Sequence, residues 1–103
     1  MNDTTMLLKQ IIPAGRENAI SRQSVAAALG MSDRQTRKAI ELARAEGLLI
    51  INEQDGRGYY RSEDVKELLR QYRQDTARAM TILTRRKALR DTLLEMGVRK
   101  DVL

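Results

Sequence analysis

The feature that most constrains the fold is a pair of short helices, each with its own start signal, in residues 20–47. Ser21 is suited to cap the first helix, because its hydroxyl can accept from an early backbone N–H. Gly30 ends that helix, since glycine most readily adopts the left-handed conformation just past a helix C-terminus. Ser32 and Gln35 then give the S-x-x-Q pattern of a capping box. A second helix therefore begins almost at once, and two helices so closely joined must cross at a steep angle.

Apolar residues recur at helical spacing on one face of each of these helices. Ile20 and Val25 bracket the Ser21 cap as a hydrophobic staple. On the second helix, Ile40 and its neighbours form the apolar side. The opposite face is rich in charge, and four of its five members are cationic: Arg34, Arg37, Lys38, Glu41 and Arg44.

The segment LGMSDRQTRKAI resembles the LGVSxxTVxxAL core of bacterial helix-turn-helix domains. The matching positions are the small residue where the helices touch, the turn glycine and three core residues: Ala26, Gly30, Met31, Ala39 and Ile40. Thr36 departs from the family, which usually has Val or Ile there. Either its methyl packs inward with its hydroxyl bonded to the preceding turn, or the second helix sits slightly differently. An unrelated helical hairpin is the alternative to this resemblance.

The flanking sequence predicts a third helix and a β-hairpin. Asp3 or Thr4 can cap a helix that ends before Pro13, because proline disfavours helix at the preceding residue. The branched apolar run at residues 48–51 reads as a strand, and residues 59–61 as the return strand after a glycine-containing turn. EGLLIINEQDGRGYYR resembles the wing of small bacterial transcriptional regulators. The resemblance implies a mainly α fold with a small β-hairpin, a winged helix-turn-helix domain over residues 1–61, with a three-helix bundle and a two-stranded wing.

In that family the second motif helix enters the major groove, and the wing tip reaches a phosphate or the minor groove. The resemblance therefore implies that Ser32, Asp33, Arg34, Arg37 and Lys38 face DNA, with Arg57 on the wing. Arginine matches guanine edges and phosphate oxygens, and a helix N-terminus binds phosphate. Asp33 either accepts from a cytosine or only complements the helix dipole, and we favour the dipole. Glu41 is predicted to pair with its cationic neighbours.

The last third predicts one long helix over residues 62–97, capped by Ser62, with a tail at residues 98–103 that frays. Apolar residues alternate at three and four along it: Val65, Leu68, Tyr72, Ala79, Ile82, Leu89, Leu93 and Met96. Asp75 and Arg86 interrupt this seam. The pattern predicts a coiled coil that joins two copies of the chain. The alternative is a monomer in which the first turns pack back on the domain. The helix is also basic, and either flanks DNA or is only solvated.

Composition limits the classes of function. The 103 residues include no Cys and no His, which excludes a thiolate nucleophile and the usual zinc site. We expect no metal, no cofactor and no small-molecule ligand. The carboxylate pairs Glu53 with Asp55 and Glu63 with Asp64 lack a base or a phosphate loop beside them, so we expect no enzyme. Without a signal peptide or a membrane-length apolar run, we expect a cytoplasmic protein. The net charge of +5 suggests a polyanionic partner.

These features lead us to expect a sequence-specific, homodimeric binder of double-stranded DNA, acting by site occupancy, without an effector domain. The arrangement is similar to small helix-turn-helix regulators of bacteria, phages and prophages. The alternative is a winged-helix interaction or accessory module of replication or recombination, with weak or no specific DNA binding.

Overall fold

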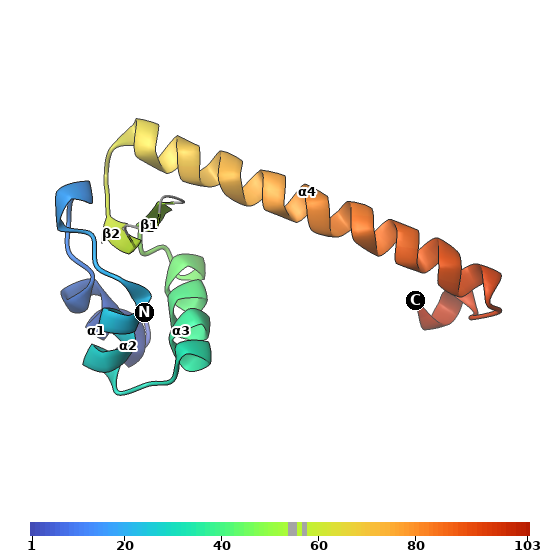
Figure 1. The fold of residues 1–103 in the computed structure, drawn as a ribbon, viewed down its shortest axis with the longest axis horizontal. Coiled ribbons are helices and arrows are strands. Elements are labelled where there is room, and N and C mark those ends of the chain that lie inside the picture. Colours follow the sequence, from blue (N-terminus) through green and yellow to red (C-terminus); the bar gives the residue numbers. More distant parts are fainter. Residues whose placement is uncertain (54–55, 57) are drawn as a thin grey trace. The chain divides into compact units, whose positions relative to one another are not determined.

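The computed structural model describes residues 1–53, 56 and 58–103. In chain order, its elements are α1 (Asp3–Ile11), a 3-10 turn (Arg16–Asn18), α2 (Arg22–Leu29), α3 (Asp33–Ala45), β1 (Ile50–Glu53), β2 (Gly58–Arg61), α4 (Val65–Glu95) and a second 3-10 turn (Lys100–Val102). The described chain is thus mainly helical, with a two-stranded antiparallel hairpin and a long C-terminal helix, as the sequence predicts (Figure 1). Contacts divide it into a first unit, Met1–Gln71, and a second unit, Tyr72–Leu103.

The predicted start and stop signals around α2 and α3 are confirmed. Ser24 N donates to Ser21 Oγ at 3.1 Å, and Gly30 has φ 66° at the end of α2. At α3 both halves of the capping box form, since Gln35 N donates to Ser32 Oγ at 3.1 Å and Ser32 N to Gln35 Oε1 at 3.0 Å. Local sequence therefore fixes where both helices begin and where α2 ends.

The cap of α1 differs from the prediction by one or two residues. Asn2, rather than Asp3 or Thr4, accepts from Thr5 N through Oδ1 at 2.8 Å. Asn is as good a cap as Asp, and Asp3 instead lies in the first turn, where its charge complements the helix dipole. The helix ends before Pro13 as expected, with Ile12 in extended conformation.

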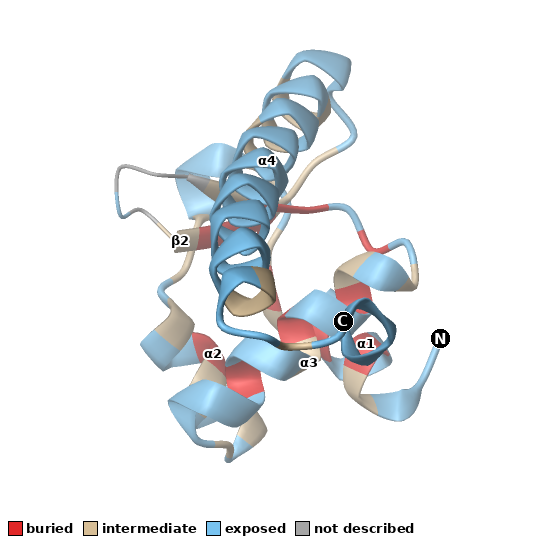
Figure 2. Ribbon diagram, turned by 90° about the vertical axis from the view of Figure 1, so that its right-hand side faces the viewer, coloured by how far each residue is buried: buried red, intermediate tan, exposed pale blue. Residues whose placement is uncertain are grey.

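The hydrophobic core lies between the first three helices and the hairpin. Figure 2 shows the buried residues gathered on these elements, whereas α4 has none. Aliphatic side chains and one tyrosine fill this core, as a chain poor in aromatic residues requires. The core residues are Leu8, Ile12, Val25, Ile40, Ala43, Leu48, Ile50 and Tyr59.

The hairpin begins two residues later than predicted. Leu48 N donates to Ala43 O at 3.0 Å and so completes the C-terminal turn of α3, which leaves Ile50 as the first residue of β1. Ile50 pairs with Arg61 across the two strands. The outer edge of β2 is also occupied, because Tyr59 exchanges both backbone hydrogen bonds with Ile20, at 2.7 and 3.0 Å. A two-stranded hairpin needs such support to be stable.

The second face of the hairpin meets the first turns of α4. Tyr60 is fully buried there, and its hydroxyl donates to Glu67. Gln71 Oε1 accepts from Asn52 N at 3.0 Å. Asp64, rather than Ser62, caps the helix, since Asp64 Oδ1 accepts from Lys66 N at 2.8 Å and its carbonyl accepts the first helical bond. The start of α4 therefore belongs to the first unit.

The second unit is the exposed remainder of α4 and a short tail. The helix ends at Glu95, two residues before the predicted end, and Gly97 turns the chain with φ 95°. Val98 N donates to Leu93 O at 3.0 Å, and the tail, predicted to fray, contains the Lys100–Val102 turn. Within the described residues, no helix combines the length and the apolar character needed to cross a bilayer.

Candidate nucleic-acid interface

The exposed face of α3 carries the predicted DNA-facing residues. Its buried face, formed by Thr36, Ile40 and Ala43, turns toward the core. The side chains on the other side are exposed over the first two turns. Five of the six predicted residues meet there: Ser32, Asp33, Arg34, Arg37 and Lys38. The sixth, Arg57, lies outside the described residues.

Thr36 fits the core although it departs from the family pattern. It is completely buried, and its hydroxyl donates to Ser32 O at 2.8 Å. The methyl group therefore packs inward while the polar atom is satisfied within the helix. This is the first of the two alternatives predicted from the sequence, and α3 keeps its cap with Thr36 in the core.

Asp33 is an acceptor for two arginines. Its Oδ1 lies 2.5 Å from Arg22 Nε, and its Oδ2 lies 3.2 Å from Arg37 Nε. The hydrogen bond from Arg22 holds the pKa of Asp33 below its ordinary value, and the charges of Arg22 and Arg37 lower it further. Each oxygen therefore has an arginine partner, and Asp33 links the start of α2 to the second turn of α3.

This carboxylate orients Arg37. Arg37 Nε lies 3.2 Å from Asp33 Oδ2, and 58% of the Arg37 side chain is exposed. Arg37 thus pairs with Asp33, whereas the sequence predicts Glu41 as its partner. Both ion pairs would have helical spacing, and the one that forms is the pair with Asp33 in the first turn. A guanidinium paired through Nε keeps its two terminal amino groups as donors for another acceptor.

Arg22 is the member of this site that the sequence analysis missed. It begins α2, and no periodic pattern links it to Asp33, eleven residues away. The pKa of Arg22 is raised, first by the bond to Asp33 and then by the side chain of Tyr59 on β2. Arg22 therefore connects the start of α2 with the start of α3. Only the crossing of α2 over α3 brings these groups together.

Arg44, at the other end of α3, has a structural role. Its Nε donates to Ile50 O at 3.3 Å, and its guanidinium carbon lies 6.0 Å from the centre of the Tyr59 ring. The side chain therefore ties α3 to β1 and β2 instead of extending the cationic face. The cations that face solvent on the first turns of α3 are Arg34, Arg37 and Lys38.

Gly58 lets the hairpin approach the segment before α2. It has φ 100°, and a Cβ built on it would lie 2.0 Å from Ile20 O. That distance is far inside van der Waals contact, so the position requires glycine for both its conformation and its space. The base of the hairpin is thereby fixed beside Ile20, just before α2.

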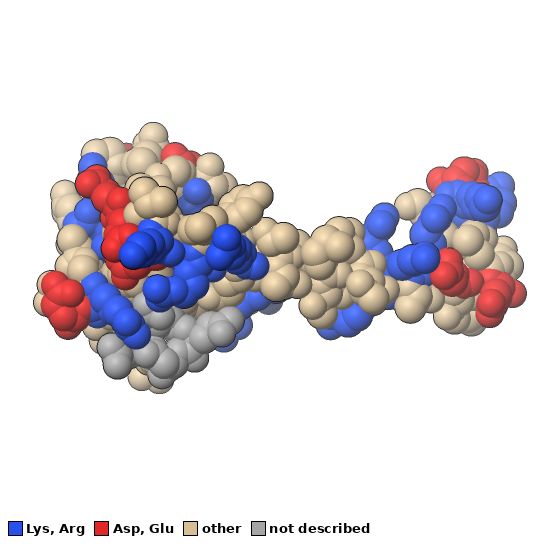
Figure 3. Space-filling view, turned by 90° about the horizontal axis from the view of Figure 1, so that it is seen from above, with Lys and Arg blue, Asp and Glu red and all other residues tan. Residues whose placement is uncertain are grey.

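The positive charge is unevenly divided along the chain. The first unit has 11 Lys and Arg against 10 Asp and Glu, while the second has eight against four. Residues 76–90 alone contain five Lys and Arg and no acidic residue, and all are exposed. Figure 3 shows cationic side chains on both units, with acidic ones among them at the far end of α4. The face of α3 is thus a small cationic surface on a nearly neutral unit.

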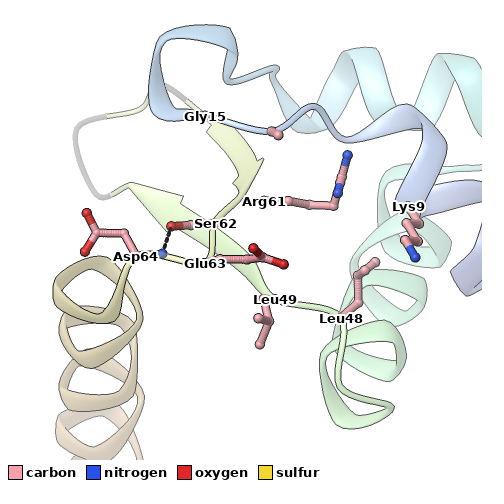
Figure 4. A pocket seen from close by; sticks show the side chains of 9 residues that line it. Lys9, Gly15, Leu48, Leu49, Arg61, Ser62, Glu63 and Asp64 are labelled. Atoms are coloured by element: carbon pink, nitrogen blue, oxygen red, sulfur yellow. Dashed lines mark hydrogen bonds between the residues drawn. The ribbon is translucent and has the colours of Figure 1, made fainter.

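A separate hollow of about 580 Å³ lies between the end of α1 and the chain before α4. Lys9, Arg61 and Glu63 reach toward it from its walls, while Asp64 lies beside α4 (Figure 4). Arg61 is engaged there, since its Nε donates to Ile12 O at 2.7 Å. The hollow carries charges of both signs, and none of its described lining residues lies on α3. Within the part of the chain that the structure describes, no group of three acidic residues is arranged to hold a metal ion.

No family model matches the chain, and no curated protein or solved structure matches it either. The interpretation of the α3 surface therefore rests on its own geometry and charge.

Proposed function

We propose that the chain is a winged helix-turn-helix protein that binds specific sites in double-stranded DNA through α3. In this proposal it is a bacterial or phage transcription regulator that acts by occupying its site as a homodimer. It is a binding protein without catalysis, cofactor or small-molecule ligand. The hairpin is the wing, and α3 is the recognition helix that enters the major groove.

The observation that carries the proposal is the construction of α3. Three residues on one side of the helix are buried. The cations Arg34, Arg37 and Lys38 project from its other side within the first two turns. A helix of this width fits the major groove, and its N-terminal turns are the part that reaches base edges. The free N–H groups of the first turn also favour a phosphate.

The ion pairs around Asp33 support sequence-specific binding in addition to a general attraction to DNA. Arg37 is oriented by a carboxylate that Arg22 holds in turn, at 3.2 and 2.5 Å respectively. A side chain fixed before binding loses less conformational entropy when it meets its ligand. Such pre-orientation favours a bidentate contact with guanine over a diffuse attraction to phosphate.

The small size of this surface supports a dimer. One short helix with three cations gives few contacts, and regulators of this kind gain affinity by reading two half-sites about 34 Å apart. In the second unit, α4 exposes Tyr72, Ile82 and Leu89 along its length. We propose that α4 joins two copies and so raises the effective concentration of the second recognition helix.

One observation favours a second candidate, an accessory module with little specific DNA binding. The first unit is almost neutral, and most of the net charge lies on α4. A basic helix beside a weakly charged domain also suits a nucleoprotein component that binds another protein through the domain. The two candidates differ in which unit carries the affinity for DNA.

Fluorescence anisotropy with duplexes selected from a random library distinguishes them. We expect Arg34→Ala and Lys38→Ala each to weaken binding and to lower the salt slope by about one unit for each lost phosphate contact. Arg37→Ala should in addition relax sequence preference, because a base contact is lost. Lys9→Ala is the matched control, since it removes one exposed charge from α1.

Equal losses in Lys9→Ala and in the α3 variants would reject a specific role for α3. Unchanged binding in all four, with loss on neutralising the cations of residues 76–90, would favour the accessory module. Thermal unfolding of each variant checks the fold, since exposed substitutions usually change stability by less than about 0.5 kcal/mol.

A further inference from the structure

One face of α4 in the second unit exposes a stripe that contains large apolar side chains. Tyr72 is 70% exposed, Ile82 48% and Leu89 62%, although all three are large apolar side chains. Alternating spacings of three and four place them on one stripe, which is the repeat of a left-handed two-helix contact. The stripe consists of six residues: Tyr72, Asp75, Ala79, Ile82, Arg86 and Leu89.

The two charged members of the stripe decide the orientation of a partner helix. In a parallel pair of identical helices, Asp75 would face its own copy and Arg86 would face its own copy. Like charges enclosed at such a contact are strongly unfavourable. In an antiparallel pair, Asp75 faces the partner's Arg86, and the symmetry repeats this ion pair. A second copy of the chain therefore complements the stripe in one direction only.

The same register matches every apolar position. Facing residues then have numbers that add to 161, so Tyr72 faces the partner's Leu89. Ala79 faces the partner's Ile82, which sets a small side chain against a large one at the centre. In each layer, a residue at heptad position a faces a residue at position d of the partner helix, as antiparallel packing requires.

The surface of α4 also contains a hollow where this register requires a hole for a partner side chain. A shallow hollow of about 110 Å³ is lined by Arg86, Leu89, Arg90 and Leu93, with Leu103 from the tail at its edge. The helical residues have the spacing i, i+3, i+4, i+7, which is the four-residue hole that accepts a side chain from a facing helix. In the register above, the side chain opposite this hole is the partner's Tyr72. Two arginines at the hole also suit an aromatic ring.

We infer that a second copy of the chain packs antiparallel on this face, with Asp75 opposite the partner's Arg86 and Tyr72 in the partner's hollow. This inference rests on the dimer of the proposed function and specifies its orientation and register. Arg78 and Arg85 flank the stripe, where long side chains cover apolar surface and keep their charged ends in water.

Disulfide trapping tests the register, because the native chain contains no cysteine. We expect Tyr72→Cys and Leu89→Cys to form a covalent dimer when mixed, and neither to do so alone. In this register, two copies of residue 72 are separated by 17 residues along the axis, roughly 26 Å, whereas a disulfide needs Cα atoms within about 7 Å. Cross-linking of each variant with itself would overturn the antiparallel arrangement. No cross-linking in any sample would overturn the contact.

Charge reversal gives a second readout that keeps all apolar residues. By sedimentation equilibrium of the full chain, Asp75→Arg and Arg86→Asp should each raise the dimer dissociation constant at least tenfold. The double variant should recover most of this loss, since the pair is restored with opposite signs. A double variant as weak as the single ones would contradict the register. DNA is absent from these experiments, so their failure leaves the proposed role of α3 to its own test.

Discussion

Arg22 Nε lies 2.5 Å from Asp33 Oδ1 and thereby joins the first turn of α2 to the first turn of α3. Both groups are partly exposed, with 33% of the Arg22 side chain and 55% of the Asp33 side chain open to solvent. The bond therefore acts at the surface, where it joins the starts of two helices that also share the hydrophobic core. It also fixes the carboxylate that orients Arg37.

The first prediction concerns acid stability. Because the pKa of Asp33 is lowered in the folded chain, chiefly by Arg22, its contribution to stability is complete above the ordinary Asp value of about 3.9. The contribution is lost as the pH falls from there through the lower folded value. Asp33→Asn should thus lower the thermal midpoint at neutral pH, and the difference from wild type should shrink below about pH 3.9.

The control for this prediction is Asp3→Asn. Asp3 is also a first-turn carboxylate, on α1, and has no ion pair with the residues that the structure describes. It should show a smaller change at neutral pH. If the two variants behave alike, the helix dipole rather than Arg22 accounts for the effect of Asp33.

The second prediction separates the contributions of the methyl group and the hydroxyl group of Thr36 to stability. Thr36→Ser removes a buried methyl group and should cost about 1 kcal/mol of unfolding free energy. Thr36→Val keeps the shape and loses only the hydroxyl, while Ser32 O still accepts from Thr36 N at 2.9 Å. Valine should therefore cost less than serine. Urea unfolding of both variants measures the order, and a larger cost for valine would show that the hydroxyl matters more than the methyl.

A third prediction uses two glycines of the hairpin. Gly58→Ala should destabilise the first unit by more than the roughly 1–3 kcal/mol of an unfavourable backbone conformation, because its Cβ would meet Ile20 O. Gly56→Ala is the matched control, since Gly56 has φ 83° and, its chain neighbours aside, no atom of the described residues lies within 4 Å of an added Cβ. It should cost only the conformational term. Equal thermal midpoints for the two variants would contradict the close approach of the hairpin to residue 20.

Local chemistry in the sequence was sufficient to predict the caps of α2 and α3, the turn at Gly30 and the return strand. These features depend on neighbours within about four residues. The cap of α1, the cap of α4 and the first residue of β1 differ from those predicted. At these ends several polar or apolar residues compete. Leu48 N bonds to Ala43 O and Ser62 Oγ to Glu67 Oε1, which commits these two residues to other roles.

The candidate site was predictable only in part, for the same reason. Helical spacing predicted that Arg34, Arg37 and Lys38 share a face of α3. It gave no sign that Arg22 pairs with Asp33 or that Arg44 lies over Tyr59, because both contacts join elements distant in sequence. The exposed side chains were thus predicted from pattern, whereas the groups that orient them needed the fold.

A fourth prediction concerns the boundary between the two units. A chain ending after Tyr72 should fold, because it retains the contacts of Tyr60 with Glu67 and of Asn52 with Gln71. It should be monomeric at tens of micromolar concentration, and its affinity for an operator with two half-sites should drop sharply. Circular dichroism and light scattering check the fold and the mass. A folded dimer would show that the first unit associates by itself, and an unfolded chain would show that distal α4 supports the core.

The most direct test of DNA recognition by α3 is a titration of the ¹⁵N-labelled full chain with its selected duplex, followed by amide chemical shifts at physiological salt. We expect the largest shifts at residues 32–38, with a second group in the hairpin, and small shifts in α1. Scrambled duplex should produce weaker and more salt-sensitive changes over the same residues. Shifts confined to residues 76–90, with α3 unperturbed, would contradict the account and assign nucleic-acid binding to α4 instead.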